Sequence, residues 1–217
     1  MADIAPSVIA ADYSRLEQSL SAVAPHSVRW HVDVMDGHYV PNLTIGPMIV
    51  EAIASFSELP QDVHLMIKNP SQTWRWYAKA GAARIAFHPE AADDAGRLLA
   101  EIADAGLGAG LAVNPDVAPE TVIPHLEMVD HLVMMSVNPG FSGQAFIPSV
   151  LPKLRVLRER IDAGGLKVQL VVDGGVGLDT GRQSLEAGAH VLVSASSIFA
   201  APDPAGSAAA LAALPDR

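Results

Sequence analysis

Eight short apolar segments recur along this chain of 217 residues, and longer segments with helical patterns separate them. Strands that alternate with helices pair in parallel through right-handed crossovers, and eight such units are the number that closes a barrel. The sequence therefore predicts an α/β fold, a (β/α)8 TIM barrel. The candidate strands are Asp3 to Ile9, Val28 to Met35, Gln61 to Ile67, Ala83 to His88, Leu107 to Val113, His131 to Val137, Lys167 to Asp173 and Ala189 to Ser194.

The intervening segments fit amphipathic helices, with charged residues between spaced apolar positions. The Ala-rich segment 205–214 fits a final helix, with a disordered tail as the alternative. An open doubly wound sheet usually has a glycine-rich turn after its first strand, which is absent here. Because half of the residues are hydrophobic and no linker divides the chain, we expect one domain, residues 1–217. The other predicted helices are Tyr13 to Val23, Trp74 to Ala80, Ala92 to Ala105 and Val150 to Ala163.

Composition and charge exclude several kinds of function. The chain contains no cysteine, so any metal site must use nitrogen and oxygen ligands. The net charge of -10 opposes binding to nucleic acid, which requires a basic surface. The amino terminus lacks the features of a signal peptide, and no apolar run of about 18 residues indicates a membrane span. We therefore expect a cytoplasmic protein without nucleic acid or membrane partners.

Carboxylates and imidazoles interrupt three of the apolar strands. Residues i and i+2 of a strand point to the same face, so His31 and Asp33 form half of a metal site on one strand. His64 lies in the third strand and Asp173 ends the seventh. One such residue is commonly satisfied by a backbone group at a strand end, but three such strands favour a shared site. Because barrel active sites lie at the carboxyl ends of the strands, we expect these four residues to converge there.

Two imidazoles and two carboxylates can bind Zn²⁺, Fe²⁺, Mn²⁺ or Co²⁺, and the ligand types do not choose among them. Four protein ligands usually mark a structural site unless the coordination can expand. Nearby glycine turns favour catalysis on an anionic ligand, because backbone N–H groups can cradle a phosphate. Ordinary turns are the alternative. The loops concerned are Asn138 to Gln144, Gly174-Gly175 and Ala195-Ser196.

Several motifs together resemble the ribulose-phosphate 3-epimerase family, in order along nearly the whole chain. They are IAPS at 4–7, HVDVMDG at 31–37 followed by VPN at 40–42, DVHLM at 62–66, MSVNPGF at 135–141 and VDGGV at 172–176. The resemblance implies a TIM barrel of the ribulose-phosphate-binding type that interconverts D-ribulose 5-phosphate and D-xylulose 5-phosphate. The expected substrate is therefore a phosphorylated ketopentose.

The resemblance also implies the roles of individual residues. One divalent metal ion, Zn²⁺ or Fe²⁺ with Mn²⁺ or Co²⁺ as alternatives, would be bound by His31, Asp33, His64 and Asp173. Asp33 and Asp173 would also be the catalytic acid and base. The substrate would contact Ser7, His31, His64, Gly140, Phe141, Ser142, Gly143, Asp173, Gly174, Gly175, Ala195 and Ser196. The reacting carbons would be lined by Met35, Met66 and Met135, for which core packing is the alternative.

The expected chemistry fits two carboxylates. Inverting a carbon next to a ketone requires removal of its proton on one face and return of a proton on the other, through an enediolate. A carboxylate on each side can exchange these protons, and a metal ion can stabilise the developing oxyanion.

Two positions depart from the family pattern, and both touch the expected phosphate site. Ser142 and Ala195 stand where relatives usually have glycine. Serine can strain the loop if the backbone there needs a positive φ, and the Ala195 methyl group adds bulk beside the phosphate. We expect weakened or adjusted phosphate binding at most.

Three other functions remain as alternatives. An epimerase for D-allulose 6-phosphate would share the metal motif. A metal-free decarboxylase or aldolase on a similar barrel would need an Asp-x-Lys-x-x-Asp motif on the third strand, where this chain reads DVHLM without lysine. A non-catalytic relative that binds sugar phosphate or metal is the third. We also expect a homo-oligomer, as is common for barrels with exposed apolar faces.

Overall fold

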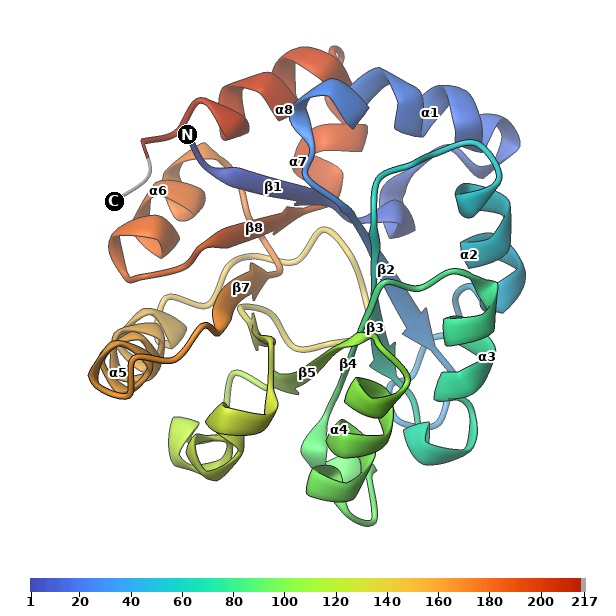
Figure 1. Ribbon diagram of the computed structural model, residues 1–217. Helices are drawn as coiled ribbons and strands as arrows, with labels where there is room; N and C mark the ends of the chain where they lie inside the picture. The colour runs from blue at the N-terminus through green and yellow to red at the C-terminus, as the bar shows by residue number, and fades with distance from the viewer. Residues whose placement is uncertain (216–217) are drawn as a thin grey trace.

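The computed structural model describes residues 1–215 and arranges eight parallel strands in a ring surrounded by helices (Figure 1). Neighbouring strands pair in the order β1-β8-β7-β6-β5-β4-β3-β2, and a bridge between Ser7 and His31 links the end of β1 to β2. The predicted TIM barrel is confirmed, and the bridge that joins the two ends of this strand order excludes the open doubly wound sheet. The last two residues of the expected domain, 216–217, lie outside the described part. The strands are β1 (Asp3–Pro6), β2 (Trp30–Met35), β3 (Gln61–Met66), β4 (Arg84–Phe87), β5 (Gly108–Val113), β6 (His131–Met135), β7 (Gln169–Asp173) and β8 (Val191–Ser194).

The helices pack around this ring. Helices α3 and α5 have the predicted bounds, whereas α2, α6 and α7 were not predicted. The disordered tail is excluded because α8 buries Ala208 and Leu211. Between β5 and β6 the chain forms 3-10 turns, Pro119–Thr121 and Ile123–Met128, in place of an α-helix. The α-helices are α1 (Leu16–Val23), α2 (Pro47–Ala54), α3 (Trp74–Ala80), α4 (Ala95–Asp104), α5 (Val150–Ala163), α6 (Leu178–Glu186), α7 (Ser196–Phe199) and α8 (Pro204–Ala212).

Several predicted elements were too long, because polar side chains cap short turns at their ends. The hydroxyl of Ser7 accepts a hydrogen bond from the backbone N–H of Ile9, and this 3-10 turn ends β1 at Pro6. Asp12 caps a second 3-10 turn over Tyr13–Arg15, so the α-helical part of the predicted segment 13–23 begins only at Leu16. Side-chain caps of this kind compete locally with regular structure.

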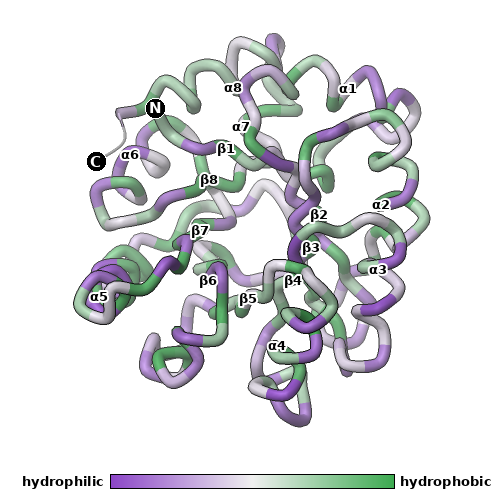
Figure 2. The backbone as a smooth tube through the Cα atoms, in the orientation of Figure 1, coloured by the Kyte–Doolittle hydropathy of each residue, from purple (hydrophilic) through white to green (hydrophobic). Residues whose placement is uncertain are grey.

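Two apolar regions hold most of the buried hydrophobic residues. The larger lies between the strands and the helices and includes Trp30, Ile85 and Leu99. Along the helices hydrophobic residues alternate with hydrophilic ones, as expected where one face packs on a barrel (Figure 2). A smaller cluster lies among the strands and consists mostly of small residues such as Ala5 and Ala86. No helix within residues 1–215 is long and apolar enough to cross a membrane.

Polar side chains occupy the barrel interior near the start of the strands. Arg29 lies 3.2 Å from Asp62 and donates a hydrogen bond to Gln169 at 3.0 Å. Gly110 leaves room for the buried ring of His131, because a Cβ at position 110 would lie 2.3 Å from that ring. This end of the barrel is thus closed by packed, paired side chains, and the opposite end holds the candidate site.

Candidate active site

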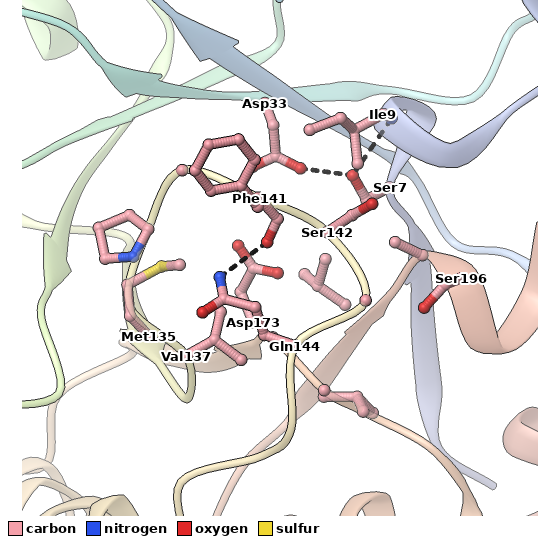
Figure 3. A pocket seen from close by; sticks show the side chains of 18 of the residues that line it. Ser7, Ile9, Asp33, Met135, Val137, Phe141, Ser142, Gln144, Asp173 and Ser196 are labelled. Atoms are coloured by element: carbon pink, nitrogen blue, oxygen red, sulfur yellow. Dashed lines mark hydrogen bonds between the residues drawn. The ribbon is translucent and has the colours of Figure 1, made fainter. Parts of the chain in front are cut away.

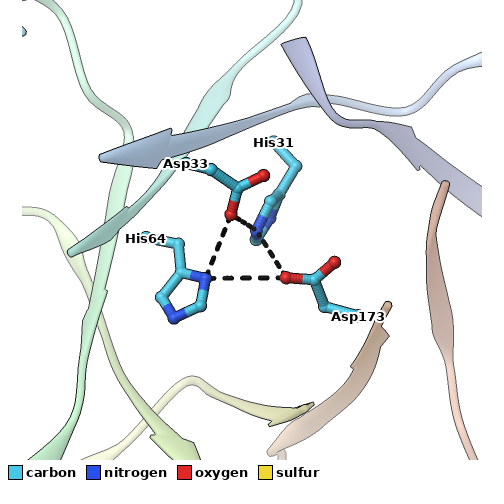
Figure 4. A group of neighbouring side chains, drawn as sticks. All are labelled: His31, Asp33, His64 and Asp173. Carbon is cyan, nitrogen blue, oxygen red and sulfur yellow. Dashed lines mark hydrogen bonds and ion pairs between the residues drawn. The ribbon is translucent and has the colours of Figure 1, made fainter. Parts of the chain in front are cut away.

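Four buried side chains meet at the carboxyl ends of the strands (Figure 4). His31 and Asp33 both come from β2, and the parallel register places Asp33 opposite His64 on β3. Asp173 reaches the group as the last residue of β7. One potential ligand atom from each residue lies within 4.8 Å of all the others. The predicted convergence is confirmed, because alternation along each strand sends these side chains into the barrel.

The spacing of these atoms fits a single metal ion. Asp33 Oδ1 is 3.2 Å from His31 Nε2 and 3.3 Å from His64 Nδ1, and Asp173 Oδ2 is 3.4 and 3.6 Å from the same two nitrogens. Two ligand atoms each about 2.1 Å from one ion are separated by about 3.0 to 3.4 Å at ordinary coordination angles. Within residues 1–215, His31 Nε2 is buried without a hydrogen-bond partner, which suits a nitrogen that binds metal. The donor set therefore fits a divalent cation.

The charges around the four residues also favour a bound cation. Burial alone would lower the pKa of His31, but the carboxylates of Asp33 and Asp173 raise it well above its ordinary value of 6.5. The pKa of His64 is raised by its hydrogen bonds to the same carboxylates, against the effect of burial. Burial would raise the pKa of Asp33, yet the two imidazoles hold it well below 3.8. The site thus favours positive charge between two carboxylates, which a divalent ion can supply.

A pocket of about 520 Å³, including space open to solvent, leads to this group (Figure 3). His31 and His64 do not line it, because both are buried within the four-residue group. The other predicted site residues all line it: Ser7, Asp33, Met35, Met66, Met135, Gly140, Phe141, Ser142, Gly143, Asp173, Gly174, Gly175, Ala195 and Ser196.

Comparison with known proteins identifies the family. The model of the ribulose-phosphate 3 epimerase family matches residues 3–199. The ribulose-phosphate 3-epimerase of Mycobacterium leprae (strain TN) is 46% identical over 209 residues, which cover 96% of this chain and 92% of that protein. The chain belongs to the ribulose-phosphate 3-epimerase family. It is therefore an isomerase, and the resemblance seen in its motifs is confirmed.

Further relatives agree in sequence or in fold. Ribulose-phosphate 3-epimerase 1 of Cupriavidus necator is 47% identical, with 94% of this chain and 86% of that protein covered. The crystal structure of 3-hexulose-6-phosphate synthase from Salmonella typhimurium has a TM-score of 0.71 at 16% identity, with 98% of this chain and 97% of that one covered. The second similarity shows the fold alone, and it again supports the TIM barrel.

The backbone accommodates Ser142 and Ala195, the two residues that depart from the family pattern. Ser142 does not adopt a positive φ, so the loop strain considered from the sequence does not occur. Ala195 has a φ of -113° and precedes α7, with its methyl group on the pocket wall. Glycine is needed instead at Gly174, where φ is +116° and a Cβ would lie 2.4 Å from Val137. These turns keep their backbone close to the pocket.

The three methionines that the sequence analysis singled out are packed in apolar clusters and also line the pocket. Met35 and Met66 pack with Val40 in a small buried cluster, and Met135 belongs to the apolar cluster inside the barrel. All three also line the pocket. The part of the pocket wall that these three buried side chains form is therefore uncharged.

Several residues in or beside the pocket were not among the predicted site residues, including Ile9, Gln144 and His88. Ile9 lines the pocket from the turn after β1. Gln144 donates hydrogen bonds to the backbone carbonyls of Asn138 and Phe141, which fixes the loop after β6. His88 contacts His64 at the end of β4. Two of these carried a signal in the sequence: Gln144 ends a glycine-bearing loop that the sequence analysis singled out, and His88 is an imidazole at the end of an apolar strand.

Proposed function

We propose that the protein is a metal-dependent 3-epimerase that interconverts D-ribulose 5-phosphate and D-xylulose 5-phosphate. The observation that carries this proposal is the pair of carboxylates, Asp33 and Asp173, which belong to the four-residue group and also line the pocket. A site with one carboxylate could remove a proton but would return it to the same face. Two carboxylates from strands β2 and β7 can serve opposite faces of one carbon.

Asp33 and Asp173 act as the proton-transfer pair. One carboxylate removes the proton from C3 of the substrate to give an enediolate, and the other delivers a proton to the opposite face. The roles are exchanged in the reverse direction. A divalent ion bound by His31, Asp33, His64 and Asp173, with Zn²⁺ or Fe²⁺ expected first and Mn²⁺ or Co²⁺ as alternatives, would supply Lewis-acid stabilisation of the developing negative charge.

Other residues hold these groups and the substrate in place. The Ser7 hydroxyl donates a hydrogen bond to Asp33 Oδ2, while Asp33 Oδ1 faces the imidazoles. This bond fixes the plane of the carboxylate and adds a hydroxyl to the pocket wall. The uncharged methionines beside the reacting carbon exclude water and offer no competing proton. Both effects favour proton transfer between substrate and carboxylates.

The phosphate of the substrate would bind at the glycine turns. Gly174 and Gly175 follow β7, Ala195 and Ser196 follow β8, and all four line the pocket. Barrels frequently bind phosphate with the loops after strands seven and eight. Because the chain has a net charge of -10, the local attraction must come from backbone N–H groups rather than from the overall field.

Metal removal tests this proposal. The protein is stripped with a chelator, resupplied separately with Zn²⁺, Fe²⁺, Mn²⁺ or Co²⁺, and assayed for coupled turnover of D-ribulose 5-phosphate. We expect activity to vanish on stripping and to return with at least one metal. Full activity without metal would refute the metal dependence. Turnover of D-allulose 6-phosphate at a higher kcat/KM than that of the pentose would refute the substrate.

Two further expectations need their own measurements. We propose that the whole chain acts as one barrel domain, because every described strand belongs to one sheet. A single cooperative unfolding transition is the expected result. Assembly into a homo-oligomer stays a prediction, which sedimentation velocity tests directly.

A further inference from the structure

His88 is a buried imidazole that the proposed reaction does not use. It follows β4, is fully buried, and begins a 3-10 turn without capping that turn through its side chain. In the part of the chain that the structure describes, its Nδ1 atom has no hydrogen-bond partner. Among residues 1–215 the only hydrogen bond of its side chain joins its Nε2 to Nε2 of His64, at 3.0 Å. An imidazole placed only to fill the core would not need this polar contact.

The contact with His64 lies on the side opposite the metal site. Nδ1 of His64 faces Asp33 and Asp173, whereas Nε2 faces His88. Two ring nitrogens at 3.0 Å need one proton between them. An imidazole that binds a metal through Nδ1 is unprotonated there and, when neutral, carries its proton on Nε2. His64 is then the donor and His88 Nε2 the acceptor.

We infer that His88 is a positioning residue, which accepts the Nε2 proton of His64 and so fixes the tautomer and ring orientation that present Nδ1 to a divalent metal. The planes of the two rings are inclined by 29°, and the ring centroids lie 5.2 Å apart with the two Nε2 atoms facing each other. This inference rests on the metal site of the proposed function. Partners of this kind affect metal affinity although they never touch the ion.

The surroundings of His88 stabilise the tautomer that this role requires. With Nε2 as acceptor, the proton of His88 sits on Nδ1, which lies 3.7 Å from Glu90 Oε1. That carboxylate is held by hydrogen bonds from the Tyr39 hydroxyl at 2.7 Å and from Asn114 Nδ2 at 2.8 Å. The Tyr39 ring also packs on His88, with centroids 4.8 Å apart. Glu90 therefore attracts the Nδ1 proton and leaves Nε2 free to accept.

A neutral acceptor suits this site better than the carboxylate that often orients a metal-binding histidine. Asp33 and Asp173 already balance the charge of a divalent ion. A third buried carboxylate against His64 would add an uncompensated negative charge, which is costly in a protein interior. An imidazole gives the same orientation without that charge.

Three variants test the inference through metal affinity. His88→Leu removes the acceptor at similar volume, His88→Gln keeps an acceptor, and His131→Leu is the matched control because it removes another buried imidazole of the barrel. Zn²⁺ and Co²⁺ affinities are measured by competition with a chromogenic chelator. We expect His88→Leu to weaken binding about 10-fold to 100-fold. His88→Gln should retain most of the affinity, and His131→Leu should match the unmodified protein.

The thermal stability of each variant separates positioning from simple packing. A packing role would lower the melting temperature equally with and without metal. A positioning role predicts that the upward shift produced by metal becomes smaller in His88→Leu. In ¹⁵N-histidine spectra of the Zn²⁺-loaded protein, we expect a protonated Nε2 and an unprotonated Nδ1 for His64.

The outcomes distinguish this inference from the proposed function. If the unmodified protein binds metal normally and His88→Leu binds it equally well, the positioning role is overturned while the metal site stands. A proton on Nδ1 of His64 in the Zn²⁺-loaded protein would also overturn it. If the unmodified protein binds no divalent metal, the metal site of the proposed function fails and this inference fails with it.

Discussion

Replacing Asp173 by asparagine is the sharpest test of the two-carboxylate reaction. Oδ2 of Asp173 lies 3.4 Å from His31 Nε2 and 3.6 Å from His64 Nδ1, so the side chain serves both the metal group and the pocket. Asparagine keeps the shape and one oxygen acceptor but cannot take up a proton at neutral pH. We therefore expect metal affinity to fall while binding remains possible at high metal concentration.

The expected effect on the rate is large. Loss of one general acid or base costs about 100-fold to 10,000-fold in kcat, equivalent to about 3 to 5.5 kcal/mol in activation free energy. The assay is coupled turnover at saturating metal, with metal content measured on the same sample. In deuterated solvent, the remaining carboxylate should still exchange the C3 proton of one epimer without producing the other. Exchange without epimerisation is the signature of two bases on opposite faces.

The matched control is Asp62→Asn. Asp62 is also buried inside the barrel, on β3, but it pairs with Arg29 at the opposite end. Breaking that pair should lower the free energy of unfolding by about 3 kcal/mol and leave kcat of the folded protein nearly unchanged. The reasoning would be refuted if Asp173→Asn, fully loaded with metal, kept kcat within about tenfold of the original, below the usual cost of a lost acid or base.

Three further predictions concern the pocket turns and the loop after β2. Ala195→Gly should lower KM for the sugar phosphate without changing kcat, and an unchanged or higher KM in steady-state assays would contradict this. Gly174→Ala should cost about 2 to 5 kcal/mol, because φ is +116° and the new Cβ would meet Val137, and calorimetry should show a melting temperature lower by roughly 5 to 20 °C. Hydrogen bonds from three backbone N–H groups outweigh the effect of burial and lower the pKa of Asp36 below 3.8. The charged Asp36 carboxylate therefore stabilises the folded protein above pH 3.8, and this stabilisation is lost as the pH falls through the lowered pKa. The stability difference between Asp36→Asn and the original protein should therefore shrink in acid denaturation below pH 3.8, and a constant difference would count against it.

The sequence was sufficient for the order of the strands and for the four residues that converge at their carboxyl ends. Its eight strands were found within three residues of their observed ends, although Ser7 and Asp12 shorten their elements through side-chain caps. Helix α2 was missed, although it starts at a proline and has a strongly apolar composition. The turn before β6 lacks an α-helix altogether. Such ends and exceptions depend on local hydrogen bonds that compete with the periodic pattern.

The amino-acid sequence by itself determined which side chains face the barrel interior, because alternation along a strand is a local property. The sequence therefore contained residue types that can bind a metal ion, and it placed His31 and Asp33 on the same face of one strand. Only the tertiary structure decided that Asp173, 142 residues after His31 in the chain, lies 3.4 Å from it. The tertiary structure also decided that His64 contacts His88 and that Ser142 does not adopt a positive φ. Distances across a closed barrel depend on strand register and closure, which involve the whole chain at once.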